Sequence, residues 1–176
     1  MFLKSHSISL RSVEPSDTNF LFIIENDITN WHVSLTQTPF SKFVLDEFVN
    51  LAHNDIYTNK QLRLVIQKNE TLEPVGIIDL FEFNPQHARS GLGIFISEKF
   101  RNNNFAFESI ELIKQYCFDI LHLKQIYVDV SENNLASLSL FEKASFYRCG
   151  IKKSWNKTAL NTFENICLLQ CINISE

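Results

Sequence analysis

Hydrophobic residues alternate with polar ones in several short stretches of this chain, a pattern typical of strands with one buried face. Residues 8–13, ISLRSV, and residues 61–67, QLRLVIQ, follow it. Residues 75–83, VGIIDLFEF, are almost continuously apolar, which indicates a strand covered on both faces. With the remaining apolar stretches, the sequence predicts strands at about residues 8–13, 61–67, 74–83, 90–97, 124–130, 146–151 and 166–172.

Other stretches place apolar residues three or four positions apart, as an amphipathic helix does. The first helix runs to about Glu25, and either Ser16 or Asp17 can cap its start. The second is predicted at about residues 42–53, with Phe43, Phe48 and Leu51 in the core. Two further helices are predicted, from Ala106 to Ile120 and from Asn134 to Lys143.

The order of these elements is one strand, two helices, three strands, a helix, a strand, a helix and two strands. Runs of consecutive strands favour antiparallel pairing, whereas the strand–helix–strand unit at residues 90–130 adds a parallel pair. We therefore predict a mixed α/β (α+β) fold with a mostly antiparallel central sheet and flanking helices. A length of 176 residues suits one domain over residues 1–176.

Charge and composition exclude several classes of protein. Lys and Arg total 16 against 20 Asp and Glu, and no basic run occurs, so we expect no nucleic-acid partner. No apolar run reaches the length of a membrane span, and the first residues do not resemble a signal peptide. We expect no membrane partner and a cytoplasmic location.

Four cysteines occur in the chain, and none forms a C-x-x-C pair or a Cys/His cluster with the spacing of a zinc site. We expect them to be reduced thiols and expect no metal. Cys167 and Cys171 fall on one face of a predicted strand, so core packing is their expected role.

The loop between the predicted strand at 90–97 and the helix from Ala106 reads EKFRNNNFAFE over residues 98–108. The first N–H groups of a helix have no intrahelical partner, and the helix dipole makes this end positive, so an anion such as pyrophosphate fits here. Arg101 adds a charge and a forked donor. Asparagine tolerates left-handed backbone, so residues 102–104 can stand where glycines are expected. The alternative is a solvated turn that caps the helix.

Two motifs resemble the GNAT superfamily of N-acetyltransferases. RNNNFA at residues 101–106 is similar to the signature Gln/Arg-x-x-Gly-x-Gly/Ala, with Asn104 in place of the middle glycine. NLASLSLFEKASF at residues 134–146 is similar to Asn-x-x-Ser-x-x-Leu-Tyr-Glu-Lys-x-Gly-Phe, with Phe141 in place of Tyr and Ser145 in place of Gly. With Glu108, these motifs resemble the branch that acetylates ribosomal-protein N-termini, drug amines and polyamines.

The resemblance implies a binding site for acetyl-coenzyme A (acetyl-CoA), the acetyl donor. The strand before the loop would pair with the pantetheine arm through Phe95, Ile96 and Ser97, which otherwise read as an ordinary core strand. Asn134 and Ser137 would lie beside the pantetheine and thioester, although Asn134 also suits a helix N-cap. The pyrophosphate would be surrounded by Arg101, Asn102, Asn103, Asn104, Phe105 and Ala106.

Transfer of the acetyl group also needs a base that deprotonates the amine. The candidates are Asp79 and Glu82 on the predicted central strand, with Asn134 as a further catalytic candidate. Asp79 and Glu82 are three residues apart, so they point to opposite faces of a regular strand and only a bulge would bring them together. Phe141 has no hydroxyl to protonate the leaving thiolate, as the tyrosine of many relatives does.

Trp31 and His32 fall where relatives place a loop on the acceptor side. We expect Trp31 to pack against the protein and His32 to lie at the surface.

The sequence thus predicts an acetyl-CoA-dependent N-acetyltransferase of a primary amine: a protein N-terminus, a polyamine or a small amino compound. The alternative is a degenerate GNAT module that binds an acyl-CoA or a protein partner without catalysis. A homodimer is compatible with the exposed strand edges that such a sheet would have.

Overall fold

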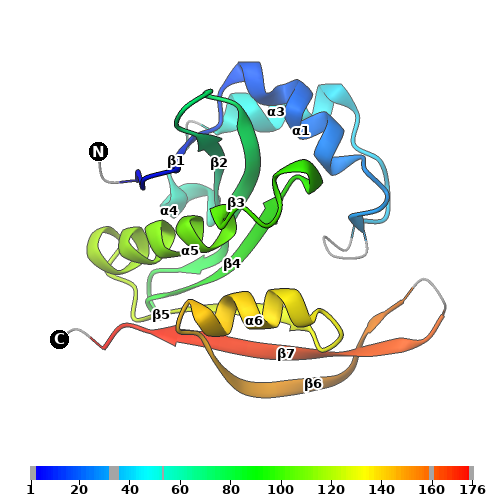
Figure 1. The fold of residues 1–176 in the computed structure, drawn as a ribbon, viewed down its shortest axis with the longest axis vertical. Helices are drawn as coiled ribbons and strands as arrows, with labels where there is room; N and C mark the ends of the chain where they lie inside the picture. Colours follow the sequence, from blue (N-terminus) through cyan, green and yellow to red (C-terminus); the bar gives the residue numbers. More distant parts are fainter. Residues whose placement is uncertain (1–2, 32–35, 53, 159–160, 175–176) are drawn as a thin grey trace.

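The computed structural model describes residues 3–31, 36–52, 54–158 and 161–174. Its described strands form one seven-stranded sheet in the order β1-β2-β3-β4-β5-β7-β6 (Figure 1). The strands are β1 (Ile8–Ser12), β2 (Leu62–Lys68), β3 (Pro74–Asn84), β4 (Arg89–Ile96), β5 (Gln125–Ser131), β6 (Tyr147–Lys157) and β7 (Phe163–Ile172).

All neighbouring strands described pair antiparallel except β4 and β5, which are parallel. A parallel pair needs a crossover connection, and α5 (Phe105–Gln115) provides it. The predicted fold class, a mostly antiparallel sheet with one parallel pair and flanking helices, is confirmed.

Helices cover the sheet unequally. On one face, α5 packs against β1 and β4, and α6 (Leu135–Lys143) contacts α5 over the same large apolar core. On the other face, α1 (Thr18–Glu25) and α3 (Lys42–Leu51) cover only the N-terminal half of the sheet, through a smaller core that includes Val65 and Ile77. Figure 1 shows this division: α1 and α3 lie at the top, and β6 and β7 extend below α6.

Three predictions about the helices were wrong in detail. In α3, Leu45 and Val49 are buried, whereas Phe43 and Leu51 are 68% and 56% exposed. Apolar residues occur on two faces of this helix, and only contact with α1 decides which face is inward. The helix predicted to reach Ile120 ends as α-helix at Gln115 and continues as a π-turn over Tyr116–Ile120. The sequence reading also missed the short helix α4 (Ile56–Asn59).

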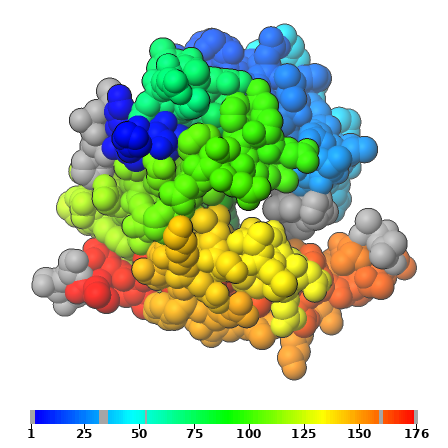
Figure 2. Space-filling model, viewed as in Figure 1, coloured from blue at the N-terminus to red at the C-terminus, as the bar shows by residue number. Residues whose placement is uncertain are grey.

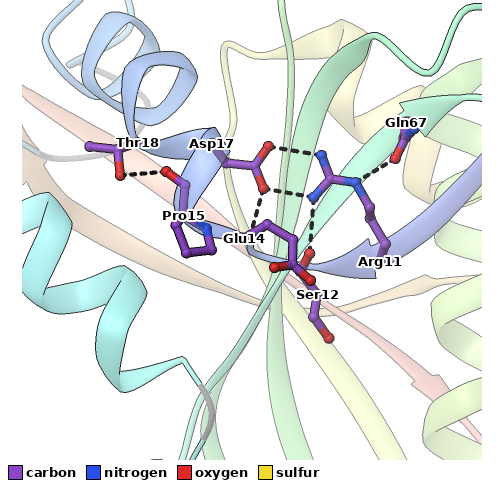
Figure 3. Close-up of polar contacts among 7 residues, drawn as sticks. All are labelled: Arg11, Ser12, Glu14, Pro15, Asp17, Thr18 and Gln67. Atoms are coloured by element: carbon purple, nitrogen blue, oxygen red, sulfur yellow. Dashed lines mark hydrogen bonds and ion pairs between the residues drawn. The ribbon is translucent and has the colours of Figure 1, made fainter.

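The predicted capping role of Asp17 was wrong in its chemistry. Asp17 stands at the N-cap of α1, but its carboxylate accepts no hydrogen bond from the first turn of that helix and belongs to a capping box with Glu14 around the preceding 3-10 turn. It instead accepts from both ends of the Arg11 guanidinium, at 2.6 and 2.8 Å, and from the amide of Glu14 at 2.8 Å (Figure 3). Gln67 accepts from Nε of the same arginine. A buried carboxylate thereby fastens β1 to the start of α1, and Pro15–Asp17 forms a 3-10 turn between them.

The described cysteines are free, and Cys117, Cys167 and Cys171 are buried in the core as small apolar residues. The expected packing role of Cys167 and Cys171 is confirmed. Within the described residues, no helix has the length and apolar character needed to span a membrane.

We predict that Asp17→Asn lowers the free energy of unfolding by about 1–3 kcal/mol at pH 7, because the half-buried Arg11 guanidinium loses its charged, buried acceptor. Burial by itself raises the pKa of Asp17, but hydrogen bonds from Arg11 and the Glu14 amide outweigh it and hold that pKa below its usual value. The stabilisation is therefore present above the unfolded-state pKa of about 3.9 and is lost as the pH falls through the lower folded-state value.

Urea unfolding of the wild type and the variant between pH 2 and pH 7 measures this difference. It should be largest at neutral pH and shrink in acid, whereas Asp119→Asn, at an exposed carboxylate, should change little at any pH. A constant difference between wild type and Asp17→Asn across the range would contradict the assignment.

Candidate active site

The central strands β4 and β5 separate soon after they meet. They pair only over Arg89–Gly91 and Gln125–Tyr127, although each strand continues beyond that point. Burial changes at the same place: Ser90, Gly91 and Leu92 are buried, and residues 93–96 are half-buried. The two halves of the sheet thus diverge from Gly91 onward and leave a gap along one edge of β4.

Backbone groups of β4 line this gap. The amide of Ser97 donates to the carbonyl oxygen of Val75 on β3 at 2.9 Å. Because hydrogen-bonding direction alternates along a strand, the backbone groups of Ile96 and Ile94 face away from β3, toward the gap. Nε of Arg101 donates to the carbonyl oxygen of Ile96 at 3.2 Å, which agrees with that direction. A ligand with amide groups can pair with such an edge as an added strand does.

The loop after β4 contains left-handed backbone at two of its three asparagines. Asn102 has φ 64° and Asn104 has φ 63°. Asn103 instead braces the loop, since its Nδ2 donates to the carbonyl oxygens of Phe100 at 3.2 Å and Arg101 at 3.1 Å. Asparagine pays a smaller steric penalty in this conformation than other non-glycine residues. The sequence interpretation of the asparagines as substitutes for glycine therefore agrees with the backbone at two positions.

The helix α5 begins directly after this loop without a side-chain cap. Asn104 occupies the N-cap, but its side chain accepts no hydrogen bond from the first turn. The leading amides, at Phe105 and Ala106, are therefore placed to bind an anion. A second cation lies nearby: Nζ of Lys143, from α6, is 3.4 Å from Oδ1 of Asn104 and 4.3 Å from the ring centroid of Phe107. Figure 2 shows the green segment that holds this loop meeting the yellow segment of α6 along one seam.

Arg101 links this loop to the segment after α1. Its Nη2 lies 3.4 Å from Oδ1 of Asn30, while its Nε holds Ile96. The indole of Trp31 donates to the carbonyl oxygen of Glu25 at 2.8 Å, so this half-buried residue packs at the end of α1 as expected. His32 lies outside the described residues.

A bulge in β3 changes the direction of Glu82. The register between β3 and β4 shifts between Phe81 and Asn84, and Glu82 has φ 48°. The hydroxyl of Tyr127 donates to Oε2 of Glu82. Phe81 contacts Tyr127 edge to face, with ring centroids 6.3 Å apart, so Glu82 reaches the face of the sheet that also carries Phe81. The buried hydroxyl of Ser90 donates to the carbonyl oxygen of Phe81 at 2.9 Å and holds the bulge in place.

Asp79 lies on the same face as Phe81, two residues earlier on β3. Both of its oxygens accept from Arg63 of β2, at 2.7 and 3.0 Å, and the same guanidinium donates to Glu25 at 2.5 Å. Burial by itself lowers the pKa of Arg63, but the two carboxylates outweigh it and raise that pKa above its usual value. Phe48 of α3 lies against the guanidinium, 5.3 Å from its ring centroid. Two carboxylates thus share one cation at the end of α1.

The residues of the second motif, 134–146, have structural roles in α6 and the core. Oδ1 of Asn134 accepts from the amide of Ser137 at 3.1 Å, so Asn134 is the N-cap of α6, as its alternative reading predicted. Phe141 is 4% exposed and packs against Phe146 with ring centroids 5.2 Å apart. The residue that replaces the usual tyrosine is therefore part of the core.

Tyr127 was missed by the sequence reading. It stands at the last paired position of β5, where the gap begins, and its hydroxyl meets Glu82. Burial and the bond to Glu82 raise the pKa of Tyr127 above its usual value. Glu82 and Tyr127 also line an open cavity of about 570 Å³ with Lys60 and Arg89. No local pattern in the sequence connects residues 82 and 127, because only the bulge and the sheet bring them together.

The structure thus brings together an unpaired backbone edge on β4, an uncapped helix start after the loop, and carboxylates on one face of the sheet. Among the described residues, no group of three or more His, Cys, Asp or Glu is placed to hold a metal. A family model described as an acetyltransferase (GNAT) domain matches residues 7–147, most of the chain. The chain therefore belongs to the GNAT acetyltransferase family, and the predicted activity class, an acetyl-CoA-dependent N-acetyltransferase, is confirmed.

Among curated proteins, the spermidine N(1)-acetyltransferase of Vibrio cholerae is 27% identical over 146 residues, covering 81% of this chain and 80% of that protein. The spermidine N(1)-acetyltransferase of Escherichia coli (strain K12) is 25% identical over 142 residues, covering 81% and 74%. Among solved structures, the Vibrio cholerae spermidine N-acetyltransferase in complex with CoA and spermine superposes with a TM-score of 0.86 at 22% identity, over 96% of both chains. The structural likeness shows a shared fold.

We predict that replacing both left-handed asparagines by alanine, Asn102→Ala/Asn104→Ala, weakens CoA binding by roughly tenfold or more. Left-handed backbone costs an ordinary residue about 1–2 kcal/mol, and the loop escapes that cost by abandoning the binding conformation. The matched variant Asn102→Gly/Asn104→Gly should keep the dissociation constant within about threefold, because glycine adopts this backbone freely. Calorimetric titration with CoA measures both variants. Equal dissociation constants for the alanine and glycine double variants would show that CoA binding does not depend on the left-handed backbone of this loop.

We also predict that Arg101→Ala weakens CoA binding by about tenfold at low salt, since a charged hydrogen bond contributes about 1.5–3 kcal/mol. The ratio to wild type should fall as salt screens the charge. Arg148→Ala, at an exposed arginine of β6, is the control and should leave both affinity and salt dependence unchanged. If the dissociation constant of CoA depends on salt in the same way in both variants, Arg101 does not bind the anion.

Proposed function

We propose that this protein transfers the acetyl group of acetyl-CoA to a primary amine of a polyamine. The observation that carries the proposal is the divergence of β4 from β5, which leaves a backbone edge leading straight to the uncapped start of α5. The similarity to spermidine N-acetyltransferases over about four fifths of the chain supports the choice of acceptor.

The donor would lie along this edge. Its pyrophosphate would meet Arg101, the amides at residues 102–106 and, from α6, Lys143. Its pantetheine amides would pair with the backbone of Ile94 and Ile96, beside Phe95 and Ser97. An arm extended from Ile96 to Gly93 spans three residues, roughly 10 Å, which would put the reacting end near the closed end of the gap. Asn134 and Ser137, at the start of α6, would lie beside the pantetheine and thioester.

The chemical step needs alignment more than it needs a covalent intermediate. The neutral amine nitrogen attacks the thioester carbonyl carbon, a C–N bond forms, and the C–S bond breaks. The nitrogen gives up one proton, and the departing CoA thiolate takes up one proton to become the thiol. Backbone amides facing the gap would stabilise the negative charge that develops on the carbonyl oxygen.

Glu82 is the carboxylate best placed to take the proton from the amine. It is exposed, one of its oxygens accepts from Tyr127, and it borders an open cavity. Asp79 has both oxygens engaged by Arg63, so we assign it an electrostatic and positioning role. Tyr127 would supply a hydroxyl near the reacting groups, which Phe141 cannot do. Asn134 would contribute by capping α6 and so holding the start of that helix in position.

The charge around the site suits a cationic acceptor. Glu25 and Asp79 share the single guanidinium of Arg63, which leaves one surplus negative charge on this face. Glu82 lies at the closed end of the gap, where Lys60 and Arg89 line the same cavity, so the surplus negative charge comes from Glu25 and Asp79. A linear polyamine carries several ammonium groups, so the amines that do not react would be held by carboxylates while one loses its proton.

Self-association belongs to the same proposal. The edge strand β6 runs over 11 residues and exposes Ile151 and Trp155, at 53% and 61%. A structure of the Vibrio cholerae enzyme with a TM-score of 0.80 is described as dodecameric. We propose that copies of this chain associate through this edge, and that the protein acts in the cytoplasm, where its free thiols stay reduced.

We predict that a thiol-release assay with acetyl-CoA shows turnover with spermidine and spermine and much less with a peptide bearing a free N-terminal amine. Glu82→Gln should lower kcat by about a hundredfold or more, the usual contribution of a general base, while CoA affinity stays the same. The side-chain amide of the variant can still accept the hydrogen bond from Tyr127. The free energy of unfolding should therefore stay the same, and measuring it is the control for this variant.

Binding of CoA without turnover on any amine would favour the alternative, a GNAT module that has lost catalysis together with its tyrosine. Turnover with unchanged kcat in Glu82→Gln would keep the proposed function and reject Glu82 as the base.

A further inference from the structure

The cavity at the closed end of the gap is formed by parts of the chain that lie far apart in the sequence. It measures about 570 Å³ and is lined by residues from the end of α4, the bulge of β3, the turn after it, β4 and β5. The amide of Phe83 donates to the carbonyl oxygen of Lys60 at 3.0 Å, which fixes the end of α4 to the bulge. Oδ1 of Asn84 accepts from the amide of His87 at 2.9 Å and holds the turn that leads to Arg89. A cavity of this size suits a small molecule.

Two cations line this cavity. Among the described residues, Nζ of Lys60 and the guanidinium of Arg89 make no ion pair and no hydrogen bond. Asp55 lies near Lys60, but its carboxylate caps the start of α4. Glu82 is the one carboxylate among the lining residues, and it accepts from Tyr127. Two positive charges thus face one negative charge, so this cavity favours an anion although the whole chain has a formal net charge of -4.

The charged groups follow one another along a single face of the sheet. Gly91 of β4 pairs with Tyr127 of β5, and Gly93 pairs with Asp79 of β3. Arg89 precedes Gly91 by two residues, so its side chain lies on the same face as Tyr127 and Asp79. Arg89 is four residues, roughly 13 Å along the strand, from the pair that holds Asp79, and Tyr127 lies at the pair between them. The proposed base therefore has surplus negative charge on one side and surplus positive charge on the other.

We infer that this enzyme has a second class of acceptor, short-chain primary amines that carry a carboxylate or a phosphate, and that Lys60 and Arg89 bind this oxyanion. The inference rests on the proposed acetyl transfer and goes beyond polyamines as acceptors. The guanidinium offers a forked pair of donors to two oxygens, and the ammonium adds a point charge. The amine nitrogen lies at Glu82, takes the acetyl group from the thioester and loses one proton, and CoA leaves as the thiol. A polyamine extends the other way, toward Asp79.

The test uses three amines with the same four-carbon chain and different far ends: 4-aminobutanoate is anionic there, 1,4-diaminobutane is cationic and butylamine is neutral. In the thiol-release assay, kcat/KM of the wild type for each charged amine should exceed that for butylamine by about tenfold, the effect of one charged hydrogen bond. A fourth amine, 3-aminopropyl phosphate, separates the two oxyanions. A higher kcat/KM for it than for 4-aminobutanoate identifies phosphate as the preferred group, and the reverse identifies carboxylate.

Substitutions in the cavity should move the two charged acceptors in opposite directions, which a merely structural role would not do. Arg89→Gln and Lys60→Gln should each lower kcat/KM for 4-aminobutanoate by about tenfold. The same variants should raise kcat/KM for 1,4-diaminobutane by about twofold, because a like charge roughly 10 Å from its second ammonium group is removed. Arg89→Lys keeps the charge and should retain most of the activity with 4-aminobutanoate. Lys42→Gln, at an exposed lysine of α3, is the control for net charge and should leave the ratio of the two acceptors unchanged.

A wild type that uses 4-aminobutanoate no better than butylamine, or a double variant Lys60→Gln/Arg89→Gln that uses it as well as the wild type does, would overturn the inference and leave polyamine acetylation standing. A wild type without turnover on any amine would reject the proposed function. In that case calorimetry of 4-aminobutanoate with the CoA-loaded protein still decides whether the cavity binds the oxyanion. The inference requires binding that the double variant loses, and the absence of binding to the wild type overturns it.

Discussion

The unpaired edge of β4 is the constraint on which the rest of the site depends. A central strand normally satisfies its amides and carbonyls on both sides, and leaving one side open exposes polar groups that need a partner. β3 pairs with β4 along its length, but β5 stays with it for only three residues and then continues with β7. The gap between the half-sheets is thus a strand position that a ligand can occupy. The anion loop lies at its open end, and the bulge with Tyr127 lies at its closed end.

This chain places glycine and left-handed backbone at different positions. Ten described non-glycine residues have positive φ, and no described glycine does. Asn102 and Asn104 form the anion loop, and Glu82 forms the bulge, each at a conformational cost that the surrounding contacts must offset. Gly76 and Gly91 instead allow close approach: a Cβ added at Gly76 would come within 2.2 Å of the Phe95 carbonyl oxygen, and one at Gly91 within 2.3 Å of the Phe81 ring. Three of these ten positions, Asn102, Asn104 and Glu82, thus lie at the two ends of the gap, and the other seven lie elsewhere in the chain.

Electrostatics on the open face follow from one shared cation. Arg63 ties Asp79 on β3 to Glu25 at the end of α1, and Phe48 covers the guanidinium. Removing a partner from such a half-buried network leaves an uncompensated charge, which is why these groups hold each other's positions. The same contacts hold the end of α1 in place. The segment that follows α1 contains Asn30, which contacts Arg101. The Arg63 network and the loop that contains Arg101 are therefore connected through the segment that follows α1.

The sequence by itself determined the order of the strands and of the longer helices, the class of fold and the position of the loop before α5, because periodicity and loop chemistry are local properties of the chain; anion binding at that loop stays a prediction. It also identified Asn102 and Asn104 as substitutes for glycine, and Asn134 as a cap. Only the tertiary structure decided which face of α3 is buried and that Asp17 binds Arg11 rather than the first turn of its helix. It also brought Glu82 to the face of Asp79 through a bulge and joined Glu82 to Tyr127. These outcomes depend on contacts between residues far apart in the chain, where strand register and competing partners outweigh local preference.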